Sequence, residues 1–296
     1  MKIIVTEEKR LDNYLNEQLD ISRSQIQKLI EKGNITVNEK QVKNSYMLKI
    51  DDEINVTLEE NINIEDIIPE KMDLDIVYED DDVIVVNKEN GVVVHPGNGN
   101  YNHTLVNGLV YHSNLSDLNG KFRPGIVHRI DAYTTGLLMI AKNNKAHEFL
   151  AKQLEEKKVT RKYIALVWGV IKNDTGTIDA PIGRDKLDRK KMAVTDINSK
   201  KAVTHFKVLE RFNNATLIEL KLETGRTHQI RVHMNYINHP VVNDPVYGKR
   251  KIIDESGQCL HAKIIGFTHP TTLKYMEFNS ELPQCFINIL NTFKDS

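Results

Sequence analysis

Residues 125–142 read GIVHRIDAYTTGLLMIAK and hold the densest mixture of polar side chains in the chain. A histidine, an arginine, an aspartate, a tyrosine and two threonines lie between two apolar runs, and Gly136 allows a tight turn before the second run. A polar loop held between buried strands is a common way to present a functional site. The same residues also fit a structural turn closed by Asp131, so this segment alone leaves both interpretations open.

Short apolar runs on both sides of this segment predict strands rather than long helices. We expect strands at residues 75–78, 83–87, 91–94, 137–141, 163–167 and 216–222. One helix is expected at residues 145–157, where apolar side chains recur on one face. Because helices do not alternate regularly with strands, the pattern predicts an α+β fold with a mixed, largely antiparallel sheet.

The N-terminal 58 residues have a different pattern, which predicts a small separate domain. Apolar residues recur at helical spacing from Leu11 to Leu19 and again before Gly33, and a turn at residues 38–40 then separates two strand regions. Residues 59–74, EENINIEDIIPEKMDL, are acidic and show no clean period. We therefore predict a helix-helix-hairpin domain at 1–58, an acidic linker at 59–74 and a larger domain at 75–296.

The formal net charge of −1 hides an uneven distribution of charged residues. Residues 83–296 contain 30 Lys and Arg but only 20 Asp and Glu. A basic domain fits a polyanionic partner, although a solvated lysine-rich face gives the same count of charges.

The sequence has no run of eighteen apolar residues and no secretory h-region, and its two cysteines, Cys259 and Cys285, are far apart. We expect a soluble cytoplasmic monomer without a membrane contact or a protein partner.

Three further segments contain candidate site residues. Residues 223–233, ETGRTHQIRVH, alternate as in a strand, which would place Gln229 and Arg231 on one face. Residues 161–169, RKYIALVWG, place Tyr163 at the start of a buried strand, and residues 183–194 form a basic loop. Each segment also has a purely structural interpretation: an exposed basic edge strand for 223–233, a core tyrosine for 161–169 and a solvated turn for 183–194. The histidines lack the spacing of metal ligands, so we expect no metal site. The sequence also has no P-loop and no nucleophile elbow, which argues against nucleotide hydrolysis and serine-hydrolase chemistry.

Taken together, these segments resemble the Rlu-type (RluA/RluD) family of RNA pseudouridine synthases. The matching motifs follow one another in the family's order. They are VVNKENGVVVHPG at 85–97, GIVHRID with TTGLLMIAK, RKYIALVWG, ETGRTHQIRVHM at 223–234, HPVVNDPVYG at 239–248 and LHAKIIGFTHP at 260–270. The N-terminal residues are similar to the S4-type RNA-binding domain that precedes this catalytic domain. The resemblance covers nearly the whole chain.

The resemblance implies roles for particular residues and an RNA substrate, with ribosomal RNA favoured and transfer RNA an alternative. Asp131 would be the catalytic aspartate, Tyr163 would lie against the flipped uracil, and Arg226 would pair with Asp131. Arg129 would enter the RNA stack where the target uridine leaves. The remaining residues expected to bind RNA are His128, Arg23, Lys28, Lys32, Arg184 and Arg231. Ala132 and Tyr133 depart from the family pattern, which usually has Lys and then often Asp there.

Pseudouridine formation breaks the glycosidic bond of uridine, turns the uracil and rejoins it through carbon, with no redox change. We therefore expect no cofactor. One carboxylate suffices, either by trapping the sugar covalently or by removing the neighbouring sugar proton, and the sequence does not choose between these routes. Two other functions remain as alternatives: a non-catalytic RNA-binding or ribosome-assembly protein on the same fold, and a glycosidase, which needs a second carboxylate near the first.

Overall fold

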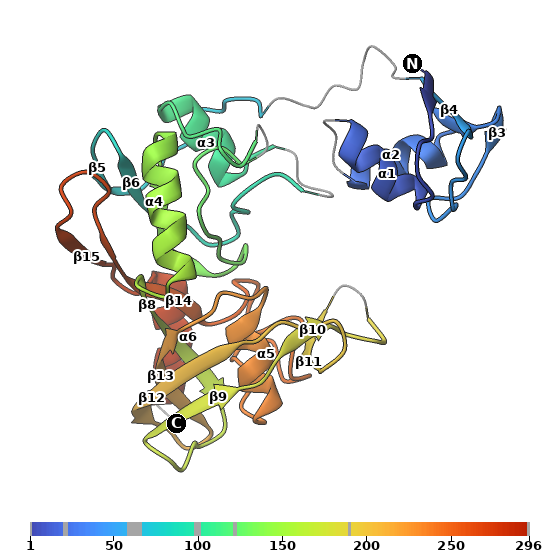
Figure 1. Ribbon diagram of the computed structural model, residues 1–296. Coiled ribbons are helices and arrows are strands. Elements are labelled where there is room, and N and C mark those ends of the chain that lie inside the picture. The colour runs from blue at the N-terminus through green and yellow to red at the C-terminus, as the bar shows by residue number, and fades with distance from the viewer. Residues whose placement is uncertain are drawn as a thin grey trace. The chain divides into compact units, whose positions relative to one another are not determined.

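The computed structural model describes residues 2–19, 23–57, 67–97, 102–120, 123–188 and 191–294 (Figure 1). Contacts within the chain divide it into two compact units, Met1–Asp66 and Ile67–Ser296. Among the described residues, every helix is too short or too polar to span a bilayer.

The smaller unit packs two helices against a four-stranded antiparallel sheet. Its elements are β1 (Lys2–Ile4), α1 (Leu11–Gln18), α2 (Arg23–Glu31), β2 (Ile35–Val37), β3 (Lys40–Gln41) and β4 (Glu53–Val56). The strand order is β1-β4-β2-β3. Leu11 and Leu15 of α1 meet Ile26 and Ile30 of α2 over the sheet, so the helical apolar spacing forms the core. The predicted helix-helix-hairpin order is confirmed, and β1 adds a strand that the sequence did not predict.

The larger unit is built on a nine-stranded sheet. Its strands are β5 (Ile76–Glu79), β6 (Val83–Lys88), β7 (Thr135–Ala141), β8 (Thr160–Trp168), β9 (Thr175–Asp179), β12 (Val203–Arg211), β13 (Ala215–Leu222), β14 (Leu260–Thr268) and β15 (Tyr275–Asn279). The order is β5-β6-β7-β14-β8-β13-β12-β9, and β15 pairs with β14. Among these described strands, only β7 and β14 pair in parallel. The fold is thus α+β with a mixed, largely antiparallel sheet, as predicted.

Helices cover both faces of this sheet. They are α3 (Leu105–His112), α4 (Asn144–Glu155), α5 (Gln229–Tyr236) and α6 (Gln284–Lys294), and a hairpin of β10 (Ile182–Arg184) and β11 (Met192–Val194) lies beside α5 (Figure 1). Alternate residues of β6 show the two-sided burial: Val83 and Val85 join the core that contains α4, whereas Ile84 and Val86 join the core that contains α3. In β8, Tyr163 packs with the α5 side and Ile164 with α6.

Two predicted strands are wrong. Residues 91–94 follow β6, but their carbonyls bond to the first turn of α3: Leu105 N donates to Val93 O at 2.8 Å, and Val106 N donates to Val94 O at 3.0 Å. Residues 227–232 contain the start of α5, not a strand. His228 takes a left-handed conformation with φ of 56° and precedes the first helical residue, so the strand-like alternation after it belongs to a helix.

The predicted linker at 59–74 ends later than the structure supports. Residues 67–74 pack onto α3 of the larger unit, where the Asn107 amide donates to Ile68 O at 2.8 Å and Glu70 N donates to Asn107 O at 3.0 Å. Met72 and Leu74 lie against Gly108 of the same helix. These contacts use the apolar residues of an otherwise acidic segment, which is why its composition alone indicated a linker.

Candidate active site

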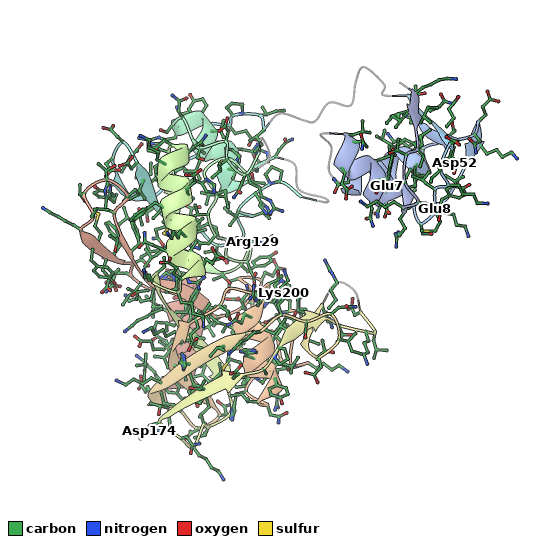
Figure 2. All side chains as sticks on the ribbon, viewed as in Figure 1. Glu7, Glu8, Asp52, Arg129, Asp174 and Lys200 are labelled. Carbon is green, nitrogen blue, oxygen red and sulfur yellow. The ribbon has the colours of Figure 1, made fainter. Side chains whose placement is uncertain are left out.

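A cavity of about 570 Å³ opens in the larger unit and contains the motif residues on its walls. That volume is in the range that holds a small ligand or an extruded nucleoside. One wall is the segment from Arg123 to Thr134, another is the start of β8, and a third is the segment from Leu222 to Arg231 that leads into α5. Arg129 lies between the end of the larger unit that carries α3 and α4 and the end that carries α5 (Figure 2).

The loop that carries Asp131 is fixed from beneath by a buried lysine. Lys88, at the end of β6, is 2% exposed, and its ammonium donates to the carbonyls of Ala132 and Glu89 at 2.7 Å each. Thr134 N donates to Asp131 O at 3.0 Å and closes the turn. Burial lowers the pKa of Lys88 to about 7, against the opposing charge of Asp131. The departure at Ala132 leaves this anchor intact, because a backbone carbonyl makes the contact.

The Asp131 carboxylate is paired with an arginine of α5. Arg231 Nη1 donates to Asp131 Oδ2 at 3.0 Å, and only 17% of the aspartate side chain is exposed. His228 Nε2 lies 3.9 Å from the other oxygen of the same carboxylate. The charge-assisted hydrogen bond from Arg231 fixes the orientation of the Asp131 carboxylate at the cavity wall.

A second carboxylate holds Arg231 in place. Asp244 accepts from Arg231 Nε at 2.7 Å and from Nη2 at 2.8 Å, and its Oδ1 also accepts the backbone N–H groups of Val246 and Tyr247. The Tyr247 ring lies 5.1 Å from the guanidinium carbon. Burial opposes the charge of Arg231, but Asp244 and then Asp131 outweigh it and raise its pKa. The two hydrogen bonds to Asp244 therefore fix the Arg231 guanidinium so that its Nη1 points at Asp131.

Two predicted roles in this segment are corrected. Arg226 is not the partner of Asp131: its Nε donates to Lys201 O at 2.9 Å, although the residue lines the cavity. Arg231, predicted to bind RNA, has a side chain that is 5% exposed, and all three of its nitrogens donate to carboxylates, so it serves the site rather than an RNA phosphate. The family resemblance implied the pairing with Arg226, but α5 begins between the two arginines, and Arg231 in this helix makes the contact.

Tyr163 lies on the cavity wall as predicted, on β8 beside the α5 core. Burial raises the pKa of its hydroxyl, which also lies within electrostatic reach of both Arg161 and Asp131. The tyrosine is therefore a neutral, mostly apolar surface next to the carboxylate at ordinary pH. Such a ring fits the flat face of a base.

The other candidate RNA contacts fall into three groups. Arg129 is exposed on the cavity rim, with Nη1 3.4 Å from His95 Nε2. His128, predicted to bind RNA, is corrected: its Nε2 accepts from Met139 N at 3.1 Å, and burial lowers its pKa to about 3, so it carries no charge for a phosphate. Lys32 and Arg184 are exposed, whereas the side chains of Arg23 and Lys28 lie outside the described residues.

The sequence interpretation assigned no role to Lys88, Asp244, His228 or Arg161. A lysine at the end of the apolar run VIVVNK and an aspartate in VVNDPVYG were the available signals, because charged residues inside apolar runs are retained mainly where they are paired. Among the described residues, no three His, Cys, Asp or Glu side chains gather in a way that would hold a metal ion.

Comparisons with known proteins agree with this geometry. The family model described as RNA pseudouridylate synthase matches residues 82–236, and the S4 domain model matches residues 9–54. The chain is 54% identical to the RNA pseudouridine synthase YlyB of Bacillus subtilis over 96% of this chain and 94% of that protein. It is 43% identical to the ribosomal large subunit pseudouridine synthase D of Neisseria meningitidis serogroup B, over 96% of this chain and 79% of that protein.

A solved structure of human RNA pseudouridylate synthase domain containing 1 is similar with a TM-score of 0.59 and 27% identity, and covers 76% of this chain and 96% of that one. The fold and the site define an enzyme that isomerises a base within RNA. The chain belongs to the RNA pseudouridine synthase family and carries an N-terminal S4 domain.

Proposed function

We propose that this enzyme converts specific uridines of large-subunit ribosomal RNA to pseudouridine, with Asp131 as its catalytic carboxylate. The observation that carries the assignment to Asp131 is the Asp131–Arg231–Asp244 chain on the cavity wall, which holds one carboxylate in a fixed orientation. The ribosomal substrate is supported by the names of relatives at 40–47% identity, among them synthases D of Neisseria, Zymomonas and Pasteurella.

The proposed reaction begins when the target uridine leaves the RNA stack and enters the cavity. The C1′–N1 bond breaks, and its electron pair leaves with the uracil. Asp131 then either bonds to C1′ or removes the C2′ proton. The uracil turns and C5 bonds to C1′, while Asp131 leaves C1′ or returns the proton to C2′. Finally C5 loses its proton and N1 gains one. The neutral Tyr163 side chain lies against the base, and water accepts the C5 proton.

The smaller unit contributes RNA affinity in this proposal. Lys32, which follows α2 directly, is exposed, and the sequence of α2 contains Arg23 and Lys28. Contacts of this kind to phosphates add affinity that depends on salt and little on sequence. We propose that the protein acts in the cytoplasm as a monomer, because RNA is its substrate and the cavity is complete within one chain.

Mapping of pseudouridines in total RNA from cells with and without the gene tests the proposal. We expect at least one large-subunit ribosomal pseudouridine to disappear and to return with the wild-type gene but not with an Asp131→Asn gene. Loss confined to transfer RNA would contradict the substrate. An unchanged map would contradict the activity and favour the alternative of a non-catalytic RNA-binding protein.

A further inference from the structure

Arg161 is a buried cation on the cavity wall that the proposed mechanism does not use. It lies on β8 two residues before Tyr163, so both side chains are on one face of the strand, while Lys162 between them is on the other. Arg161 is 9% exposed and lines the same cavity as Asp131 and Tyr163.

Within the described chain, the guanidinium of Arg161 has neither a hydrogen bond nor an ion pair, and its buried Nε has no partner. Its neighbours, by contrast, are paired. Arg231, on the same cavity, is bonded to two carboxylates, and Lys162 is paired with Glu219 at 3.3 Å. Burial lowers the pKa of Arg161. Holding a charge that is largely buried and has no described partner is costly, and an acceptor supplied by the bound RNA would offset that cost.

The backbone leaves room for this side chain. A Cβ at Gly225 would lie 2.7 Å from Arg161 Nη1, closer than such atoms approach in proteins. Only glycine at position 225 therefore allows the guanidinium to reach its place beside the cavity. The position of the cation is built by two segments, β8 and the loop before α5.

The order of groups along the wall indicates what Arg161 meets. Asp131, Tyr163 and Arg161 line the same cavity, and Tyr163 and Arg161 share one face of β8, so a base that lies against the Tyr163 ring is within reach of Arg161. With the sugar at Asp131 and the base against Tyr163, the far edge of the base faces Arg161. That edge of uracil carries carbonyl oxygens, which accept hydrogen bonds.

We propose that Arg161 is a further catalytic residue, which donates to a carbonyl oxygen of the target uracil and stabilises the negative charge that the base acquires as the glycosidic bond breaks. When C1′–N1 breaks, the bonding pair moves onto the base and spreads over N1 and the two carbonyl oxygens, while C1′ becomes electron-poor and is met by Asp131. A fixed cation in a site shielded from water is most effective where charge develops. The inference rests on the proposed function and specifies how the site holds the base.

A backbone phosphate is the competing acceptor. The surroundings of Arg161 favour the base, because Arg161 is nine-tenths buried, whereas a backbone phosphate reaches an exposed cation such as Arg129 more easily. The two acceptors differ in their response to salt, since each phosphate contact contributes to the salt dependence of affinity.

The test combines enzyme and substrate changes in full-length protein. Single-turnover rates are measured for wild type, Arg161→Met and Arg161→Lys on RNA with uridine, 2-thiouridine or 4-thiouridine at the target. Lys162→Met, on the opposite face of β8, is the matched control. We expect Arg161→Met to slow conversion of uridine by about 10²- to 10³-fold. We expect sulfur at one of the two carbonyls to slow the wild type but to add no further loss in Arg161→Met.

Three outcomes overturn the inference. Equal thio effects in wild type and Arg161→Met at both positions would mean that Arg161 touches neither carbonyl. A loss confined to affinity, with the salt slope reduced by about one, would assign Arg161 to a phosphate. An unchanged rate would remove it from catalysis. Should Arg161→Met fail to fold, the same comparison with Arg161→Lys decides. If wild-type enzyme forms no pseudouridine from the uridine RNA, the proposed function itself fails.

Discussion

At the scale of single residues, the site depends on how charges are supported rather than on which residue types are present. Asp131 contacts Arg231, and Arg231 is gripped by the fully buried carboxylate of Asp244. Lys88 holds the backbone of the same loop. Each support satisfies a buried polar group, so the position of the Asp131 carboxylate is fixed before RNA arrives.

Arg129 is exposed on the cavity rim, where its guanidinium lies beside His95, and this exposure suits a side chain that enters the RNA stack. A guanidinium is flat and stacks while it also reaches phosphates. We expect Arg129→Ala to slow conversion of a uridine in a structured stem by about 10- to 100-fold, since unstacking costs a few kcal/mol. The loss should be much smaller for a target in a flexible loop or opposite a mismatch. Single-turnover rates on the two RNAs measure this, and equal deficits would assign Arg129 to chemistry or general binding.

The buried Lys88 should make the stability of the protein depend on pH. Its folded pKa of about 7 lies below the value of an unfolded lysine, so between these values the unfolded chain binds the extra proton. Stability contributed by this group therefore rises as pH increases from about 7 to about 10, by at most about 1.4 kcal/mol per unit. We expect the free energy of unfolding of wild type minus that of Lys88→Met to grow over this range in urea titrations. A constant difference would show that Lys88 keeps an ordinary pKa.

The sequence predicted Asp131, Tyr163 and Arg129 at one site because they lie in strong local motifs, and the structure places all three on one cavity. The resemblance pointed to Arg226 as the partner of Asp131, whereas Arg231 in α5 makes this contact. The partner is 100 residues away in the chain, and its support, Asp244, comes from yet another segment. Such contacts depend on how the sheet brings segments together, which no local pattern encodes.

At the scale of elements, the parallel pairing of β7 with β14 positions the Asp131 loop relative to the rest of the sheet. Gly136 has φ of +107°, and a Cβ there would lie 2.3 Å from Ala262 O. The predicted tight turn at this glycine is in fact a close approach of two parallel strands. Because β7 begins four residues after Asp131, any displacement here moves the catalytic loop.

We expect Gly136→Ala to destabilise the protein by about 3 kcal/mol or more, from backbone strain plus overpacking. Gly91→Ala is the matched control, since Gly91 also has a positive φ of +78° but no described atom lies within 4 Å of where its Cβ would be. That variant should lose only about 1–2 kcal/mol. Urea denaturation of both compares the two effects, and similar losses would show that the β7–β14 approach is not tightly packed.

At the scale of the whole molecule, the chain combines a small RNA-binding unit with a larger catalytic one. The division lies at residue 66, and residues 67–74 stay with the larger unit through contacts to α3. We expect deletion of residues 1–66 to leave a folded larger unit that binds RNA more weakly. The slope of log affinity against log salt should flatten by about one for each phosphate contact removed. An insoluble or unfolded product would show that the larger unit needs the smaller one, and an unchanged slope would remove the S4 domain from RNA binding.

In the proposed mechanism Asp131 carries out pseudouridine formation, while other residues supply the affinity for RNA. The most direct test is single-turnover pseudouridine formation by Asp131→Asn on the mapped RNA, with Asp196→Asn, an exposed aspartate of the same unit, as the charge-matched control. We predict that Asp131→Asn loses at least about 10⁴-fold in rate, with RNA affinity within about threefold of wild type because basic residues supply the binding. Asp196→Asn should keep the wild-type rate. Substantial pseudouridine from purified Asp131→Asn enzyme would contradict the claim.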